Sequence, residues 1–92
     1  MARSRIVFTR HALRQLEDRK VARALVEEAL RNPDAVVLDS QGNPVAQKRY
    51  DDVEEGKPML LRVCFVVGAD GTQRVITMYK TSKLAKYGQG QA

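Results

Sequence analysis

The chain has 92 residues, of which 43% are hydrophobic and 29% charged, with a net charge of +5 and one cysteine. A chain of this length forms a single domain with a modest core, and one cysteine excludes an internal disulfide. One Cys and one His cannot supply the roughly four ligands of a zinc site, and no stretch approaches the roughly 18–20 apolar residues of a membrane span. We therefore expect no cofactor, no membrane partner and, without a visible signal peptide, a cytoplasmic location.

The first elements expected are a short strand at 6–8 and a helical region from about 9 to 31. Thr9 has the character of a helix N-cap. Apolar residues recur at helical spacing on both sides of Arg19-Lys20, which interrupts the pattern, so we expect two helices or one bent helix. Asn32-Pro33 ends the region, because the residue before proline is pushed out of the helical conformation. The polar, outward stripe of the first helix comprises His11, Arg14, Gln15 and Asp18.

Four strands are expected after the helices, at 35–38, 45–50, 60–67 and 73–80. A turn at 40–44 and a tight hairpin at 68–71 connect them, and Asp51–Glu55 is expected to be a solvated acidic loop. The order β-α-α-β-β-β-β predicts an α+β fold, with two N-terminal helices packed on one face of a four- to five-stranded antiparallel sheet. We expect one domain over 1–92, with a core of about 5–83 and a frayed tail at 84–92.

Alternation along the last two strands assigns their side chains to the two faces of the sheet. In the third of the four strands, Arg62 and Cys64 are expected on the face away from the helices, and Cys64 is expected to be a buried free thiol, a nucleophile being the alternative. A one-residue bulge would reverse the assignment of the last strand. The apolar face that should meet the helices comprises Met59, Leu61, Val63, Phe65 and Val67, joined by Ile76 and Met78. The face of Arg62 is expected to carry Val75, Thr77 and Tyr79.

Basic charge gathers toward both ends of the chain. Residues 1–20 hold six basic and two acidic residues, and residues 72–92 hold four basic residues and no acid. This distribution favours a polyanion such as RNA or DNA, or an acidic protein, although solubility alone is the alternative. Arg62 interrupts an apolar strand, where a charge is costly unless it is paired or exposed for use. The candidate phosphate-binding residues are Arg14, Arg19, Lys48, Arg49, Arg62, Lys80 and Lys83.

His11 is the only histidine, and it falls in the first turn of the expected helix, where the helix dipole favours a neutral imidazole. A neutral imidazole can take a proton from a ribose 2′-hydroxyl, the step that begins metal-free RNA cleavage. The alternative is a ring that only hydrogen-bonds at a helix start. Tyr79 could stack on a base and Thr77 could hydrogen-bond a phosphate, or both could be ordinary strand residues.

Three blocks of sequence, in this order and spacing, resemble the small bacterial domains grouped as domain of unknown function 4258. The blocks are Val7–Ala12 leading to Arg19, Gln47–Tyr50 with Leu61–Val63, and Val75–Tyr79 followed by Thr81–Lys83. The resemblance covers about residues 6–83. It implies membership of the RelE-like and barnase/EndoU-like (BECR fold) ribonuclease toxins, which cleave RNA on a curved antiparallel sheet. The functional positions that it implies are His11, Arg19, Lys48 or Arg49, Arg62 and Thr77.

The family's usual Glu-Arg-Gly turn between the helices here reads Asp18-Arg19-Lys20, without the glycine. This departure concerns the geometry between the helices and leaves the strand residues untouched.

These patterns lead to the hypothesis of a toxin-type, metal-independent endoribonuclease. His11 could meet Arg62 and Thr77 only around an edge of the sheet. One alternative is a non-catalytic module that binds RNA or an acidic antitoxin-like protein, and another is a structural protein that assembles through a sheet edge. The expected catalytic residues are His11, Arg62, Thr77 and Lys48. The expected RNA-binding residues are Arg14, Arg19, Arg49, Tyr79, Lys80, Ser82 and Lys83.

Overall fold

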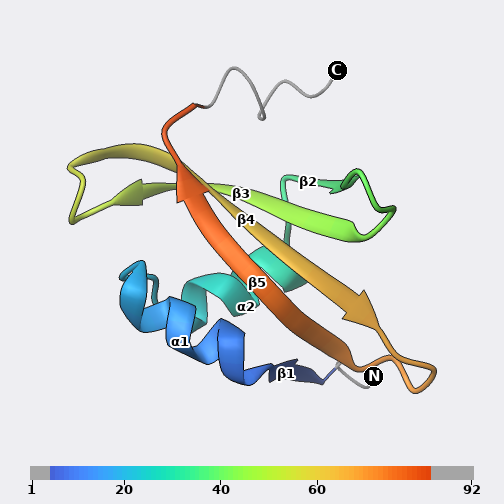
Figure 1. Ribbon diagram of the computed structural model, residues 1–92. Coiled ribbons are helices and arrows are strands. Elements are labelled where there is room, and N and C mark those ends of the chain that lie inside the picture. Colours follow the sequence, from blue (N-terminus) through green and yellow to red (C-terminus); the bar gives the residue numbers. More distant parts are fainter. Residues whose placement is uncertain (1–4, 84–92) are drawn as a thin grey trace.

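A computed structural model describes residues 5–83 as a five-stranded sheet with two helices on one face (Figure 1). The predicted order of elements and the α+β class are confirmed, and the expected tail at 84–92 lies outside the described residues. Among the described residues, no helix is long and apolar enough to cross a membrane. The elements are β1 (Ile6–Phe8), α1 (Arg10–Asp18), α2 (Arg23–Arg31), β2 (Ala35–Leu38), β3 (Pro44–Asp52), β4 (Lys57–Val67) and β5 (Gln73–Thr81).

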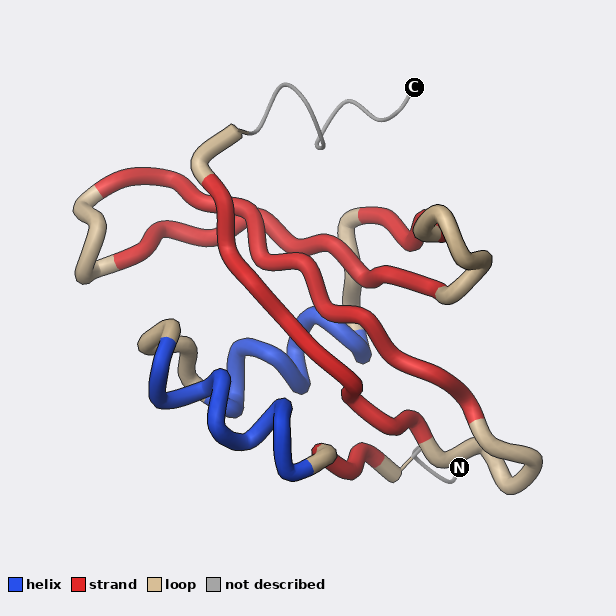
Figure 2. Tube along the Cα trace, in the orientation of Figure 1, coloured by secondary structure: helices blue, strands red, loops and turns tan. Residues whose placement is uncertain are grey.

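The sheet is mixed, with the strand order β1-β5-β4-β3-β2. Strands β2 to β5 form the expected antiparallel meander, whereas β1 pairs with the start of β5 in parallel. The fully antiparallel sheet is therefore wrong at β1. Hairpins impose antiparallel pairing on neighbouring strands, but β1 and β5 are separated by both helices and three strands, so no turn fixes their relative direction. Figure 2 shows the helices as a separate layer on one side of the strands.

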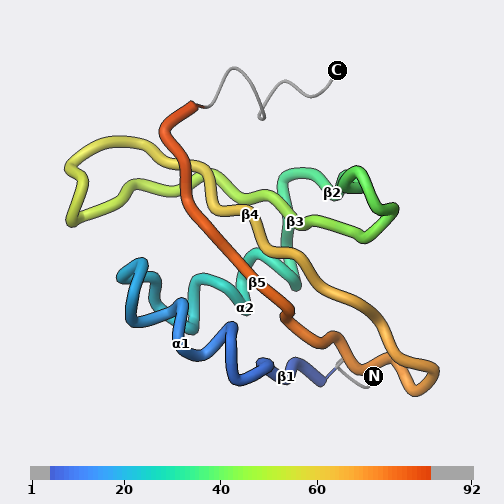
Figure 3. Tube along the Cα trace, viewed as in Figure 1, coloured from blue at the N-terminus to red at the C-terminus, as the bar shows by residue number. Residues whose placement is uncertain are grey.

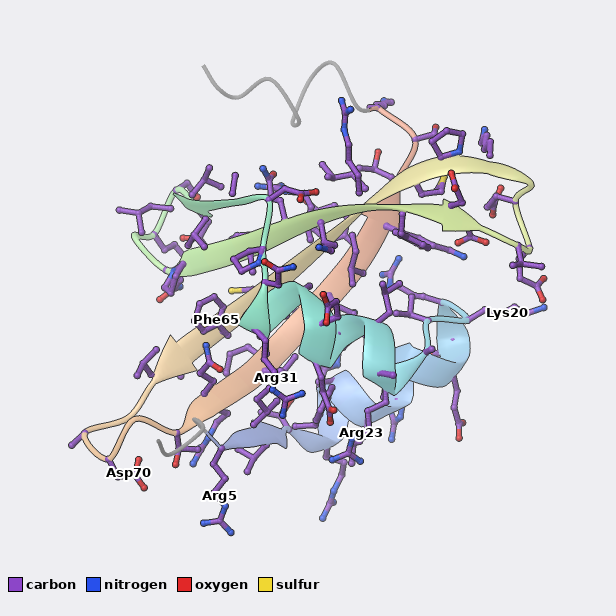
Figure 4. All side chains as sticks on the ribbon, turned by 180° about the vertical axis from the view of Figure 1, so that it is seen from behind. Arg5, Lys20, Arg23, Arg31, Phe65 and Asp70 are labelled. Atoms are coloured by element: carbon purple, nitrogen blue, oxygen red, sulfur yellow. The ribbon has the colours of Figure 1, made fainter. Side chains whose placement is uncertain are left out.

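The turn between the helices is a Schellman motif, a turn in which glycine commonly occupies the left-handed position. The amide of Val21 donates to the carbonyl of Leu16 (2.9 Å), and the amide of Lys20 donates to that of Glu17 (3.3 Å). Lys20 occupies the left-handed position of this motif, with φ of 55°. Its side chain extends outward from the turn (Figure 4). The sequence therefore places a lysine at a left-handed position, where glycine would have no steric penalty.

Replacing Lys20 with glycine should stabilise the fold by roughly 0.5–1 kcal/mol, because the left-handed conformation is strained for any residue with a Cβ. Thermal unfolding should show a midpoint that is higher by about 3–6 °C. The ion pair with Glu54 is long (3.9 Å) and exposed, so its loss should matter little. Arg19→Gly is the control, because Arg19 has φ of −101° and glycine there should lower the midpoint. A lower midpoint in both variants would contradict the assignment of strain to Lys20.

The core lies between the helices and the sheet, and a bulge in β5 corrects one predicted position. Cys64 pairs with Thr77 and Phe65 with Val75, so Ile76 is an extra residue. Val75 consequently faces the helices and is fully buried, whereas it was expected beside Arg62. The buried cluster comprises Ala12, Val21, Val26, Ala29, Leu30, Ala46, Leu61, Val63, Phe65, Val75 and Met78.

The apolar face predicted for β4 is buried from Met59 to Phe65, but Val67 is 57% exposed. The β4–β5 hairpin, which follows Val67, extends past the two helices (Figure 3).

The expected acidic loop at Asp51–Glu55 is only partly a loop. Strand β3 continues to Asp52, which is 6% exposed, and its carboxylate accepts hydrogen bonds from Tyr50, Glu55 and Lys80. Asp52 was expected to be solvated because its cationic partner, Lys80, lies 28 residues further along the chain. Burial, reinforced by Asp52, raises the pKa of Tyr50, so the Tyr50 hydroxyl keeps its proton and donates it to that carboxylate.

Candidate functional site

The sheet face without helices, called the open face below, carries two rows of side chains across β3, β4 and β5. Arg62 lies opposite Gln47 and Tyr79 in one row. The next row contains Cys64, flanked by Val45 and Thr77. Both rows face away from the helices, because the residues between them belong to the helix-facing core and side chains alternate along a strand. Thr77 and Tyr79 therefore share the face of Arg62, as the alternation predicted.

Arg62 is held in place by its two cross-strand neighbours. Its Nε donates to Oε1 of Gln47 (2.8 Å), and its Nη1 donates to the Tyr79 hydroxyl. The guanidinium carbon lies 5.5 Å from the centroid of the Tyr79 ring. Gln47, only 3% exposed, was not expected to contribute. The guanidinium is thus a fixed positive charge on the open face, the arrangement that binding a phosphate in one geometry requires.

A hollow of about 150 Å³ lies beside Arg62. Its lining comprises Asp39, Val45, Arg62, Cys64, Thr77 and Tyr79. Backbone N–H groups of Asn43 and Gln41 bind the Asp39 carboxylate and lower its pKa, although partial burial opposes them. Burial and the nearby Asp39 carboxylate raise the pKa of the Cys64 thiol, which is half-buried. This environment favours the neutral thiol and disfavours a nucleophilic Cys64.

Gln15 connects the open face to α1, although it was expected to point outward. The side chain is 9% exposed, and its Oε1 accepts from the Thr77 hydroxyl (2.7 Å) and from the Met78 amide (2.9 Å). A backbone amide can only donate, so the amide oxygen of Gln15 must face it, and Thr77 must donate its single proton to that same oxygen. Thr77 therefore presents only acceptor lone pairs to the hollow. Gln15 is buried because β1 ends at Phe8 and leaves the β5 edge to α1.

His11 lies on the segment of α1 that is attached to β5 at two points. Before it, Thr9 donates from its amide to Val75 (3.1 Å) and from its hydroxyl to Ile76 (3.3 Å). After it, Gln15 binds β5, and residues four apart share a helix face. His11 is exposed, and its ring has no hydrogen-bond partner within residues 5–83. The helical segment from Thr9 to Gln15, which contains His11, therefore runs along β5.

A profile of the family DUF4258, a domain of unknown function, matches residues 8–80. The chain belongs to this family. The match includes His11, the β4–β5 hairpin and Tyr79, so it covers the open-face site as well as the fold. Comparisons with curated proteins and with solved structures gave no significant match.

Two of the cations expected at the site lie elsewhere in this DUF4258 domain. Lys48 lies on the helix-facing side, where its ammonium donates to the carbonyl of Asn32 (2.9 Å) at the end of α2. Lys80 pairs with Asp52 on that same side of the sheet. The structure thus separates Lys48 and Lys80 from Arg62, because alternation puts neighbouring residues of one strand on opposite faces.

The remaining expected RNA-binding residues are distributed around the domain. Arg49 is exposed on the open face, opposite Leu60, while Arg14 is exposed on α1 and Lys83 follows β5. A second cleft, of about 620 Å³, lies between the end of α1 and the β3–β4 turn. It is lined in part by Arg19, Lys80 and Ser82. In the described part of the domain, no group of three or more His, Cys, Asp or Glu residues could hold a metal ion.

Proposed function

We propose that this DUF4258 domain is a toxin-type, metal-independent endoribonuclease that binds RNA on its open face. The observation that carries the proposal is the fixed guanidinium of Arg62 beside a hollow on the open face, with His11 on the helix that runs along β5. The family's grouping with RelE-like and BECR-fold ribonuclease toxins belongs to the same proposal. The substrate would be cytoplasmic RNA, and an acidic antitoxin-like protein would compete with it for the basic surface.

In this mechanism, His11 accepts the proton of a ribose 2′-hydroxyl. The 2′-oxygen then attacks the adjacent phosphorus and the bond to the 5′-oxygen breaks. The departing 5′-oxygen takes a proton from solvent, to which His11 later returns the proton that it accepted, so the products are a 2′,3′-cyclic phosphate and a 5′-hydroxyl. Arg62 stabilises the extra negative charge that develops on the phosphate oxygens. Thr77 has no proton to give to the phosphate, because it donates that proton to Gln15, so Thr77 is left out of the phosphate contacts. Lys48 is left out of the mechanism, because it binds the end of α2.

Arg49 extends the positive surface on the open face, and Arg14 on α1 and Lys83 after β5 add further exposed positive charge to the domain. Such charges give salt-dependent binding without base selectivity. Tyr79 is a strand aromatic whose ring already contacts a guanidinium, so a base would stack on the Arg62–Tyr79 pair.

The first test is incubation of mixed RNA with purified protein in excess chelator. The wild type should cleave RNA, leave cyclic phosphate ends and spare DNA, which has no 2′-hydroxyl. Arg62→Ala should reduce the rate about 100-fold, because one preorganised charge is lost. Arg31→Ala is the charge-matched control, since Arg31 extends from α2 on the helix side (Figure 4) and should leave the rate unchanged. Equal degradation by all three proteins would indicate contamination and refute the site.

A non-catalytic RNA-binding module is the second candidate function. The observation that favours it is that Arg62 is already bound by Gln47 and Tyr79, which suits a rigid recognition surface. Salt-dependent RNA binding without cleavage by the wild type would select this function over the endoribonuclease.

A further inference from the structure

The hollow beside Arg62 contains a hydrogen-bonding carboxylate that the mechanism does not use. Oδ1 of Asp39 accepts from the amides of Gln41 (2.9 Å) and Asn43 (2.8 Å), and these bonds fix the carboxylate. Oδ2 lies 3.9 Å from Sγ of Cys64, which is a weak donor. Oδ2 therefore retains acceptor capacity where Asp39 lines the hollow.

The other polar atoms of the hollow complete a defined pattern. Thr77 offers an acceptor, because its proton is committed to Gln15. The hydroxyl of Tyr79 accepts from Arg62, so its own proton is directed elsewhere and can be donated to a ligand. Asp39 follows β2 and Thr77 lies on β5, so the two acceptors stand on opposite sides of β4, with the donor and the Arg62 charge in the adjacent row.

The size and floor of the hollow limit what can occupy it. Val45 and Cys64 provide a largely apolar floor on neighbouring strands. The volume of about 150 Å³ is well below the roughly 300–1,000 Å³ typical of whole-ligand pockets. One planar ring system lying on the floor fits this space, and a whole nucleotide does not. A base in the hollow would leave its ribose and phosphate at the rim.

We propose that the hollow is a nucleobase subsite selective for guanine, which rests on the proposed binding of RNA at the open face. Guanine has adjacent N1–H and N2–H donors for Oδ2 of the Asp39 carboxylate, and its O6 accepts from the Tyr79 hydroxyl. Adenine and cytosine place a ring nitrogen lone pair beside the carboxylate, and uracil flanks its one donor with two carbonyl oxygens. Repulsion between these lone pairs and the ionised Asp39 disfavours all three.

The test measures binding and cleavage of short single-stranded RNAs that differ at one position. The wild type should prefer guanine to adenine at that position by about 5- to 150-fold, the usual effect of specific hydrogen bonds to a base edge. Asp39→Asn should reduce the preference to less than about 3-fold, because its side-chain oxygen still accepts from Gln41 and Asn43 while the charge is lost. Asp70→Asn is the matched control, since Asp70 similarly accepts from the Thr72 amide (3.0 Å) in the β4–β5 turn and should keep the preference.

Base analogues in the RNA provide a measurement that does not depend on a variant folding. Replacing guanine with 2-aminopurine, which lacks N1–H and O6, should reduce binding to the wild type to the level of adenine. Cleavage without base preference would overturn the guanine subsite but would still support the endoribonuclease. Guanine-selective binding that depends on Asp39, without cleavage, would support the guanine subsite and overturn the endoribonuclease. A wild type that neither binds nor cleaves RNA would overturn both proposals.

Discussion

Replacing Lys80 with methionine should lower the thermal midpoint of unfolding by about 10 °C or more. The Asp52 side chain is 5% exposed and the Lys80 side chain 12%, with Nζ and Oδ2 separated by 2.9 Å. Methionine has similar bulk but no charge, so the variant leaves a carboxylate in the sheet without its cation. An uncompensated buried charge is among the most destabilising changes that a single substitution can make.

Two further variants separate this effect from a general loss of charge. Lys20→Met removes an exposed ion pair of 3.9 Å and should shift the midpoint by less than about 3 °C. Lys80→Met combined with Asp52→Leu should recover part of the loss, because it removes the charge left unpaired. Recovery would be incomplete, since Asp52 also accepts from Tyr50 and from the Glu55 amide. A midpoint unchanged in Lys80→Met would show that the pair is not structurally important.

The same pair should make stability fall in acid. The hydrogen bond from Lys80, followed by those from the Glu55 amide and Tyr50, holds the pKa of Asp52 well below its usual value. A lowered pKa in the folded state adds stability above the unfolded value of about 4, and this contribution is lost as the pH falls below it. The wild-type midpoint should therefore drop between pH 5 and 2 more steeply than that of Lys80→Met. Parallel pH profiles would contradict this role.

The sequence predicts the α+β order because each element has a local signal. The Thr9 hydroxyl can cap a helix, Asn32-Pro33 ends a helix, and apolar side chains recur at every second position along β4. Contacts between distant segments have no such signal. The parallel pairing of β1, the bulge at Ile76 and the burial of Asp52 all depend on residues brought together from distant parts of the chain.

The residues of the candidate site also divide into those with a local sequence signal and those without one. Arg62 is conspicuous in the sequence because a charge in an apolar strand needs a reason, and alternation places Thr77 and Tyr79 with it. Gln15, Gln47 and Asp39 were missed as site residues, because glutamine and aspartate side chains are mostly exposed to solvent in folded proteins. Lys48 was included because its charge is visible in the sequence, whereas its partner, the carbonyl of Asn32, is a backbone group with no sequence signature.

His11→Ala should reduce RNA cleavage by about 100- to 10,000-fold, the usual contribution of general acid–base catalysis, and change RNA affinity by less than about 2-fold. The imidazole would act on the 2′-hydroxyl proton and carries little of the positive surface. Arg62→Ala should instead weaken both affinity and cleavage, since it acts on the phosphate throughout. The contrast between the two variants in kcat and KM therefore assigns each role.

Leu13→Ala is the control on the same helix, since Leu13 is 43% exposed and lies about 200° around the helix from His11. It should retain cleavage if the loss in His11→Ala reflects chemistry and not a weakened α1. Thr9 and Gln15 attach α1 to β5 on both sides of His11, so the helix should keep its place in either variant. Wild-type cleavage by His11→Ala would remove the base from the mechanism, and loss of cleavage in both variants would trace the effect to the helix.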